Sequence, residues 1–151
     1  MIKSIKKEEC YKIVDDNYVG HLGYLSGITP FVIPITYYLN TDDKSIICYS
    51  KKDHKINAMR NNKIVTLEIE SIKSVNNWKT VLIEGQYEEL DGSTAKNHLH
   101  KFSKGVKAKV LKEEKISIEF INQFSSKINK GKDIPVVFRI KIEAISGNKR
   151  E

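Results

Sequence analysis

The chain has 151 residues, of which 40% are hydrophobic, and a formal net charge of +7 at pH 7. This length suits one domain, and the hydrophobic content excludes a disordered chain. No apolar run approaches the roughly 20 residues that span a bilayer, and the basic residues of Met1–Lys7 lead into glutamates instead of an apolar signal sequence. We therefore expect a single domain over residues 1–151 that lies in the cytoplasm and has no membrane partner.

Lysine supplies nearly all of the positive charge, and a basic surface attracts anions of many kinds. Arginine, which reads nucleic-acid bases best, is scarce, and few lysines stand next to aromatic residues. We therefore expect no nucleic-acid partner and interpret most of the lysines as solvated surface residues.

Residue types that bind metals are present without metal-type spacing. Cys10 and Cys48 are far apart in the sequence, and we expect both to be free, buried thiols. His98 and His100 stand two apart on a predicted helix, where they point in different directions, so they are expected at the surface. The acidic residues on predicted strands, also expected to face solvent, are Glu68, Glu70, Glu88 and Glu89. The sequence therefore predicts no metal site.

The first half of the chain predicts a helix and then three strands in quick succession. Partial helical spacing indicates a helix over residues 5–16, with Ser4 as a candidate N-cap. Polar turns separate the strands that follow, which are residues 21–25, 30–39 and 45–50. Pro34 cannot donate a hydrogen bond to a neighbouring strand, so its strand is expected at a sheet edge, at a bulge or against a ligand.

The second half adds a helix over residues 53–61, for which Asp53 is a typical N-cap. Gly85 is expected to bend the longest strand. The elements after the helix are, in order, a strand 64–70, a loop 71–77, a strand 78–90, helices at about 92–112 and 115–128, and a last strand 134–142 ahead of a charged tail. About six short strands with helices near one end indicate a mainly β fold, a small closed antiparallel barrel with peripheral helices.

The stretch from Tyr49 to Lys55 lies where a predicted strand ends and a helix begins. The hydroxyl of Ser50, the ammonium of Lys55 and the N–H groups of the first helical turn are able to converge there. Such donors suit a phosphate, which carries roughly −1.5 to −2 charges. Lysines beside turns are also commonly solvated, so this stretch alone leaves both interpretations open.

The apolar strand from Val32 to Tyr37 contains Pro34 and offers a flat surface with free backbone groups. A planar heteroaromatic ring can lie on such a surface and have its polar edge read by the backbone. An ordinary core strand has the same composition, so both interpretations stay open here too.

Taken in order and spacing, these segments resemble the pyridoxamine 5′-phosphate oxidase-like flavoproteins, and most closely their nitroimidazole-resistance branch. The resemblance runs from about Val19 to Leu90. The segments that carry it are the strands 21–25, 30–39, 45–50 and 64–70, the junction Asp53-His54-Lys55-Ile56, the stretch Trp78-Lys79-Thr80-Val81 to Gly85, and the ending Ile145-Ser146-Gly147. It implies an FMN-binding split barrel that forms a homodimer, with FMN in two clefts at the subunit interface.

The resemblance assigns the cofactor to three sets of residues. The phosphate set comprises Ser50, Lys51, His54 and Lys55; the ring set, which lines the isoalloxazine, comprises Ile33, Pro34, Ile35, Thr36 and Tyr37; and the partner set, which reaches over from the second subunit, comprises Trp78, Lys79 and Thr80. Tyr49 occupies the place of a histidine found in some members. Asp53 stands where glycine is usual, and an acidic residue suits a phosphate site only if it turns away to cap its own helix.

These implications predict an FMN-dependent oxidoreductase, including nitroreductase-like activity, that acts on a small organic substrate. The reaction would belong to the flavin, so no catalytic side chain is assigned. Three alternatives stay open: a flavin- or haem-binding sensor or carrier without turnover, a protein that binds a phosphorylated deazaflavin, and a basic barrel that binds nucleic acid. The scarcity of arginine argues against the last of these.

Overall fold

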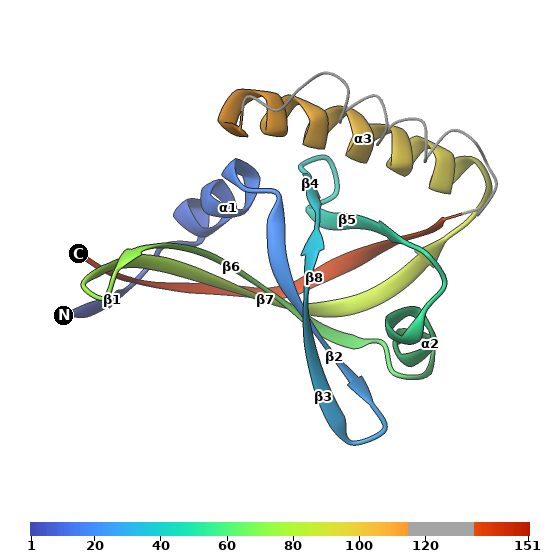
Figure 1. The fold of residues 1–151 in the computed structure, drawn as a ribbon, viewed down its shortest axis with the longest axis horizontal. Coiled ribbons are helices and arrows are strands. Elements are labelled where there is room, and N and C mark those ends of the chain that lie inside the picture. Colours follow the sequence, from blue (N-terminus) through green and yellow to red (C-terminus); the bar gives the residue numbers. More distant parts are fainter. Residues whose placement is uncertain (115–134) are drawn as a thin grey trace.

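A computed structural model of the chain describes residues 1–114 and 135–151. The expected helix 115–128 lies outside the described residues. In the rest, a strongly curved antiparallel sheet forms the body, α1 and α3 lie along one side of it, and the β2–β3 hairpin projects from the other (Figure 1). Among the described residues, no helix combines the length and apolarity that crossing a bilayer requires.

The described chain contains eight strands and three helices. The strands are β1 (Ile2–Ser4), β2 (Val19–Ser26), β3 (Thr29–Thr36), β4 (Tyr38–Asn40), β5 (Ser45–Ser50), β6 (Ile64–Ser74), β7 (Asn77–Leu90) and β8 (Val136–Arg150), and the helices are α1 (Lys7–Asp16), α2 (His54–Asn61) and α3 (Gly92–Glu114). The sheet order is β3-β2-β6-β7-β8-β5-β4, with β1 paired to β8. This confirms the mainly β, antiparallel fold with peripheral helices.

The predicted strand 30–39 is two strands, β3 and β4, which are separated at Tyr37. The backbone N–H of Tyr37 donates to the carbonyl oxygen of Tyr18 at 2.8 Å, which continues the β2–β3 register by one residue before β4 begins. β3 ends the sheet order, which confirms the edge position expected from Pro34. The shift of register between β7 and β8 at Gly85 confirms the irregularity expected at that glycine.

Two segments predicted as irregular are strands. β6 continues to Ser74 through the predicted loop 71–77, and β8 continues to Arg150 through the predicted charged tail. Residues 70–74 are exposed on both faces, so the alternation of apolar and polar residues that marks a half-buried strand is missing. Backbone pairing alone extends these strands, because β7 pairs with β6 on one side and with β8 on the other.

The N-termini of α1 and α2 are capped differently. Asp53 caps α2 as predicted, because its Oδ1 accepts a hydrogen bond from the backbone N–H of Ile56 at 3.5 Å. The predicted cap at Ser4 is wrong: Ser4 belongs to β1, and Lys6 stands at the N-cap of α1 without a capping side chain. Pairing of β1 with β8 takes Ser4 out of reach of the helix.

Buried side chains form two clusters. The larger lies inside the curved sheet and includes Val14, Leu22, Ile56, Leu67, Ile83 and Phe138, and the smaller lies under α3 and includes Ile47, Phe102, Val106, Val110 and Val137. Cys10 and Cys48 are free and buried, as predicted. The surface position predicted for His98 is wrong, because this residue is only 8% exposed. It belongs with Phe102 and Val106 to a buried stripe of α3 that recurs at every fourth residue.

Candidate functional site

The phosphate set lies in the short connection between β5 and α2. The hydroxyl of Ser50 donates to the carbonyl oxygen of Lys51 at 2.8 Å. The Nζ of Lys55 binds the Oδ2 of Asp53, whose other oxygen caps α2. Asp53 therefore turns its carboxylate onto its own helix, as the resemblance requires. With the exposed Lys51 and Lys52, the connection carries three lysines against one aspartate and is net positive.

His54 faces an aromatic cluster that sequence reasoning missed, formed with Tyr24 and Phe31. The Nδ1 of His54 lies 3.0 Å from the hydroxyl of Tyr24, and the His54 and Phe31 ring centres are 4.8 Å apart. Burial, with the charge of Asp53 as a second cause, raises the pKa of Tyr24, so its hydroxyl stays neutral. The two-residue turn at Gly27-Ile28 sets Tyr24 opposite Phe31, and that register was readable from the sequence.

The ring set is divided between the two faces of β3. Successive side chains of a strand point to opposite faces, so Ile33 and Ile35 pack toward the core while Pro34 and Thr36 point outward. Tyr37 is completely buried beyond the end of β3, and its hydroxyl donates to the carbonyl oxygen of Val14 at 2.7 Å. A ring on the outward face of β3 would thus meet Pro34 and Thr36, with the others behind them.

The position of Tyr37 has a measurable consequence. Replacing Tyr37 with phenylalanine is expected to lower the free energy of unfolding by about 1–2 kcal/mol, because one buried hydrogen bond is lost, and to leave flavin affinity unchanged. Urea denaturation measures the first effect and flavin titration the second. A variant of unchanged stability that has lost flavin would instead place this hydroxyl at the cofactor.

Tyr49 and Ser50 lie on opposite sides of β5, although they are neighbours in the sequence. Tyr49 belongs with Ile47 to the cluster under α3, where its ring meets the ring of Phe102 edge-on at 5.1 Å. Burial raises the pKa of Tyr49. Ser50 stands two residues after Cys48 on the same strand, so its side chain points to the same face, the interior of the sheet. The structure therefore places Tyr49 against α3, apart from the phosphate set.

The partner set lies at the far end of β7. Trp78, Lys79 and Thr80 follow the β6–β7 turn, which Figure 1 shows at the opposite side of the molecule from α2. Lys79 is engaged there, since its Nζ lies 3.2 Å from a carboxylate oxygen of Glu9. A single chain therefore brings the phosphate and ring sets together and leaves the partner set apart from both.

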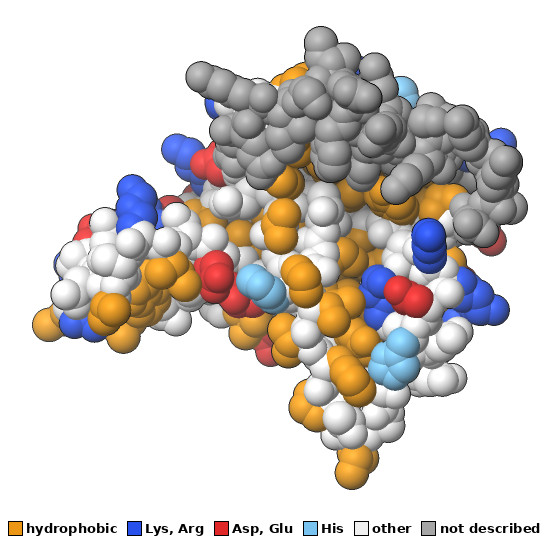
Figure 2. All heavy atoms as spheres, viewed as in Figure 1, with side chains coloured by type: hydrophobic (Ala, Val, Ile, Leu, Met, Phe, Trp, Pro, Cys, Tyr) orange, Lys and Arg blue, Asp and Glu red, His pale blue; other side chains and the backbone are white. Residues whose placement is uncertain are grey.

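Exposed apolar side chains gather on one side of the sheet, here called the outer face. Figure 2 shows hydrophobic side chains along the projecting β2–β3 hairpin and on the β6–β7 hairpin. Those that strand alternation places on the outer face include Val19, Val32, Pro34, Ile72 and Leu82. Val32 is 70% exposed. Such a patch marks an interaction surface.

Comparisons with known proteins agree with this geometry. The chain is 30% identical over 97 residues to an uncharacterized protein of Rhizobium meliloti (strain 1021), and the match spans 64% of this chain and 63% of that relative. The structure is similar to that of a FAD-binding protein from Mesorhizobium loti, with a TM-score of 0.76 and 27% identity over 100% of this chain and 98% of the other.

A second solved structure shares the fold at lower identity. A protein from Bacteroides thetaiotaomicron, provisionally assigned to 5-nitroimidazole antibiotic resistance, has a TM-score of 0.68 at 12% identity, covering 99% of this chain and 89% of the other. These likenesses confirm the predicted split-barrel fold. The family model described as pyridoxamine 5′-phosphate oxidase matches residues 6–149. Because that match covers nearly the whole sequence, the chain belongs to the pyridoxamine 5′-phosphate oxidase family.

Proposed function

We propose that this chain is a flavin-dependent oxidoreductase that binds FMN between two copies of itself and acts on a small organic substrate. The observation that carries the proposal is the basic β5–α2 connection, whose His54 packs against Phe31 of β3. The similar protein from Mesorhizobium loti is described as FAD-binding, which supports a flavin as the cofactor of this chain. The Bacteroides thetaiotaomicron neighbour supports nitroreductase-like reduction as one form of the activity.

The residues of the connection fit a flavin phosphate. Lys51, Lys52 and Lys55 supply positive charge, and the first-turn amides of α2 supply further donors. Asp53 does not cancel this fit, because its carboxylate is held by Lys55 and by the helix that it caps. Strong donors within one short connection are the arrangement that a phosphate dianion requires.

We propose that a second copy of the chain packs on the outer face. The partner set lies too far along β7 to reach the phosphate set of its own chain, so the site is complete only when another chain supplies it. A two-fold pair buries the same apolar patch on both copies and completes two equal sites. The exposed hairpins β2–β3 and β6–β7 provide the surface that such a pair would cover.

The protein's own residues would bind, orient and shield the cofactor. When bound, the flavin supplies hydride or electron transfer at its ring. Lys55 would fix the phosphate end, Pro34 and Thr36 would support the ring, and the partner set would close the cleft against water. The aromatic cluster holds the hairpin against the start of α2 and so keeps the phosphate and ring sets in register.

We expect the untreated, purified protein to be yellow, with flavin absorption bands and a cofactor that mass analysis after heating identifies. Protein without bound flavin should gain thermal stability when FMN is added, because a ligand that binds only the folded state stabilises it. Anaerobic addition of NADH or NADPH tests turnover. A colourless protein that neither FMN nor FAD stabilises would contradict flavin binding, and a bound flavin that no donor reduces would contradict the oxidoreductase.

A further inference from the structure

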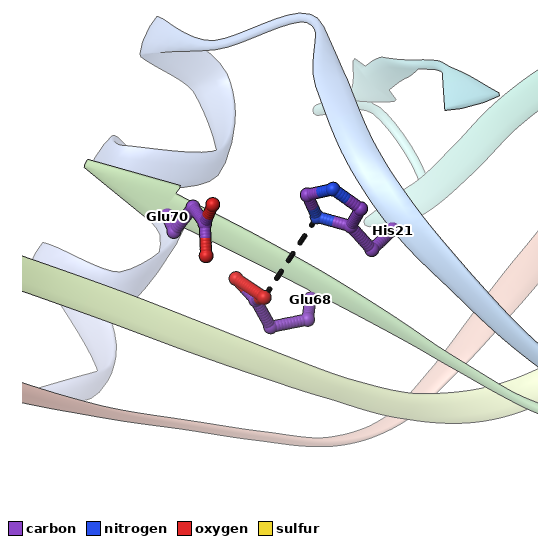
Figure 3. A group of neighbouring side chains, drawn as sticks. All are labelled: His21, Glu68 and Glu70. Carbon is purple, nitrogen blue, oxygen red and sulfur yellow. Dashed lines mark ion pairs between the residues drawn. The ribbon is translucent and has the colours of Figure 1, made fainter. Parts of the chain in front are cut away.

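Three side chains able to bind a metal converge on the outer face, outside the phosphate, ring and partner sets. They are His21 of β2 and Glu68 and Glu70 of β6 (Figure 3). His21 stands directly opposite Glu68 in the antiparallel ladder. Glu70 follows Glu68 by two residues, so it points to the same face of the sheet. Strand pairing therefore brings His21 to two glutamates that stand 47 and 49 positions further along the chain.

The distances suit one shared ion. The Nδ1 of His21 lies 3.8 Å from the Oε2 of Glu68, and one ligand atom of each of the three residues lies within 4.8 Å of the other two. Ligands bonded at about 2.0–2.2 Å to one tetrahedral ion stand roughly 3.4 Å apart. The three ligand atoms must therefore approach one another by at most about 1.4 Å, and the glutamate side chains have the rotatable bonds for such a movement.

A second observation points to a missing partner in the same place. The Oε1 of Glu68 is buried and has no hydrogen-bond partner among the described residues, although its side chain as a whole is 33% exposed. An unpaired buried carboxylate oxygen is costly unless a cation or a proton satisfies it.

The surroundings do not supply the missing positive charge. Across the ladder, His21 faces Pro34 on β3, Glu68 faces Leu82 on β7, and Glu70 faces Thr80. Among the described residues, no lysine or arginine forms an ion pair with Glu68 or Glu70. The cluster is thus two carboxylates and an imidazole whose direct ladder partners on β3 and β7 are uncharged, on a face that a second copy would dehydrate further.

We propose that His21, Glu68 and Glu70 bind a divalent transition-metal ion. One imidazole with two carboxylates favours Zn²⁺, Mn²⁺ or Fe²⁺ over Ca²⁺ and Mg²⁺, which take oxygen ligands only, and over Cu(I), which takes sulfur. Three protein ligands leave at least one coordination position for water or for a group from outside the chain. The metal neutralises both glutamates and ties β2 to β6. Neither part of this proposal depends on the flavin.

Isothermal titration calorimetry with ZnCl₂ tests the site on untagged, full-length protein that has been treated with chelator and dialysed. One Zn²⁺ is expected to bind per chain and to raise the melting temperature. Glu70→Gln and Glu68→Gln keep the shape of the side chain and relieve repulsion, so both should fold and should weaken Zn²⁺ binding at least about tenfold. Glu143→Gln, which removes an exposed glutamate from β8, is the matched control and should bind as the parent does.

Two results would overturn the proposal. One is the same Zn²⁺ affinity in all four proteins, which would place the ion elsewhere. The other is no Zn²⁺ or Mn²⁺ binding by the parent protein, with Glu68→Gln raising the melting temperature of metal-free protein, which would show that the two glutamates share a proton. Calorimetry and thermal melting detect the metal without using the absorption of a cofactor. The metal proposal and the flavin proposal can therefore be contradicted independently.

Discussion

Replacing Lys55 with alanine is expected to weaken FMN binding about 10- to 150-fold, which corresponds to the roughly 1.5–3 kcal/mol of one charge-assisted contact. The side chain of Lys55 is only 15% exposed, so its ammonium is held at the start of α2 before any ligand arrives. Its removal also releases the carboxylate of Asp53, whose charge would then repel a phosphate. Titration of flavin fluorescence with the variant measures the loss.

Two companion variants make this test specific. Lys12→Ala removes the same charge from an exposed position on α1 and should bind FMN as the parent does. Asp53→Asn keeps a good N-cap but removes the negative charge, so FMN should bind as tightly or more tightly. If Lys55→Ala and Lys12→Ala bind FMN equally well, the phosphate lies elsewhere and the β5–α2 connection is only a solvated basic turn.

Local signals explain why the junction between β5 and α2 could be predicted from the sequence. The end of β5, the cap at Asp53 and the start of α2 depend on residues within one short stretch, and the structure has all three where the sequence predicts them. The edge position of Pro34 follows in the same way, because a residue without an N–H is excluded from the middle of a sheet. Such features need no knowledge of distant partners.

Features that depend on strand pairing could not be predicted. His21 meets Glu68 only because β2 lies beside β6, with β3, β4, β5 and α2 between them in the sequence. The extension of β8 to Arg150 likewise rests on its pairing with β7 and not on its own composition. His98 was misplaced for a related reason, since a helix shows its buried face only once its packing partner is known.

The separation of the three residue sets within one chain is the reason why the proposed function includes a second copy. The phosphate and ring sets lie together, and the partner set lies at the opposite end of the sheet. On the proposed function, folding of one chain would produce half of each cofactor site, and pairing of two chains would produce the rest. This predicts that loss of the dimer and loss of the flavin occur together, which distinguishes a shared site from one built within a single chain.

Replacing Val32 with arginine is expected to split the dimer and to lower flavin affinity at least about tenfold, because a two-fold interface receives the new charge twice and juxtaposed like charges cost several kcal/mol. Val32 is 70% exposed in the single chain, so the arginine should leave the fold of that chain intact. Size-exclusion chromatography with light scattering measures the mass in solution, and flavin titration measures the affinity.

Asn97→Arg is the matched control, since it adds the same charge to an exposed position on α3, away from the outer face. It should remain a dimer and keep its flavin. A Val32→Arg variant that is monomeric but binds flavin as the parent does would show that one chain completes the site alone. A variant that remains dimeric would show that the second copy covers a different face, and the partner set would then have to reach the flavin by another route or not at all.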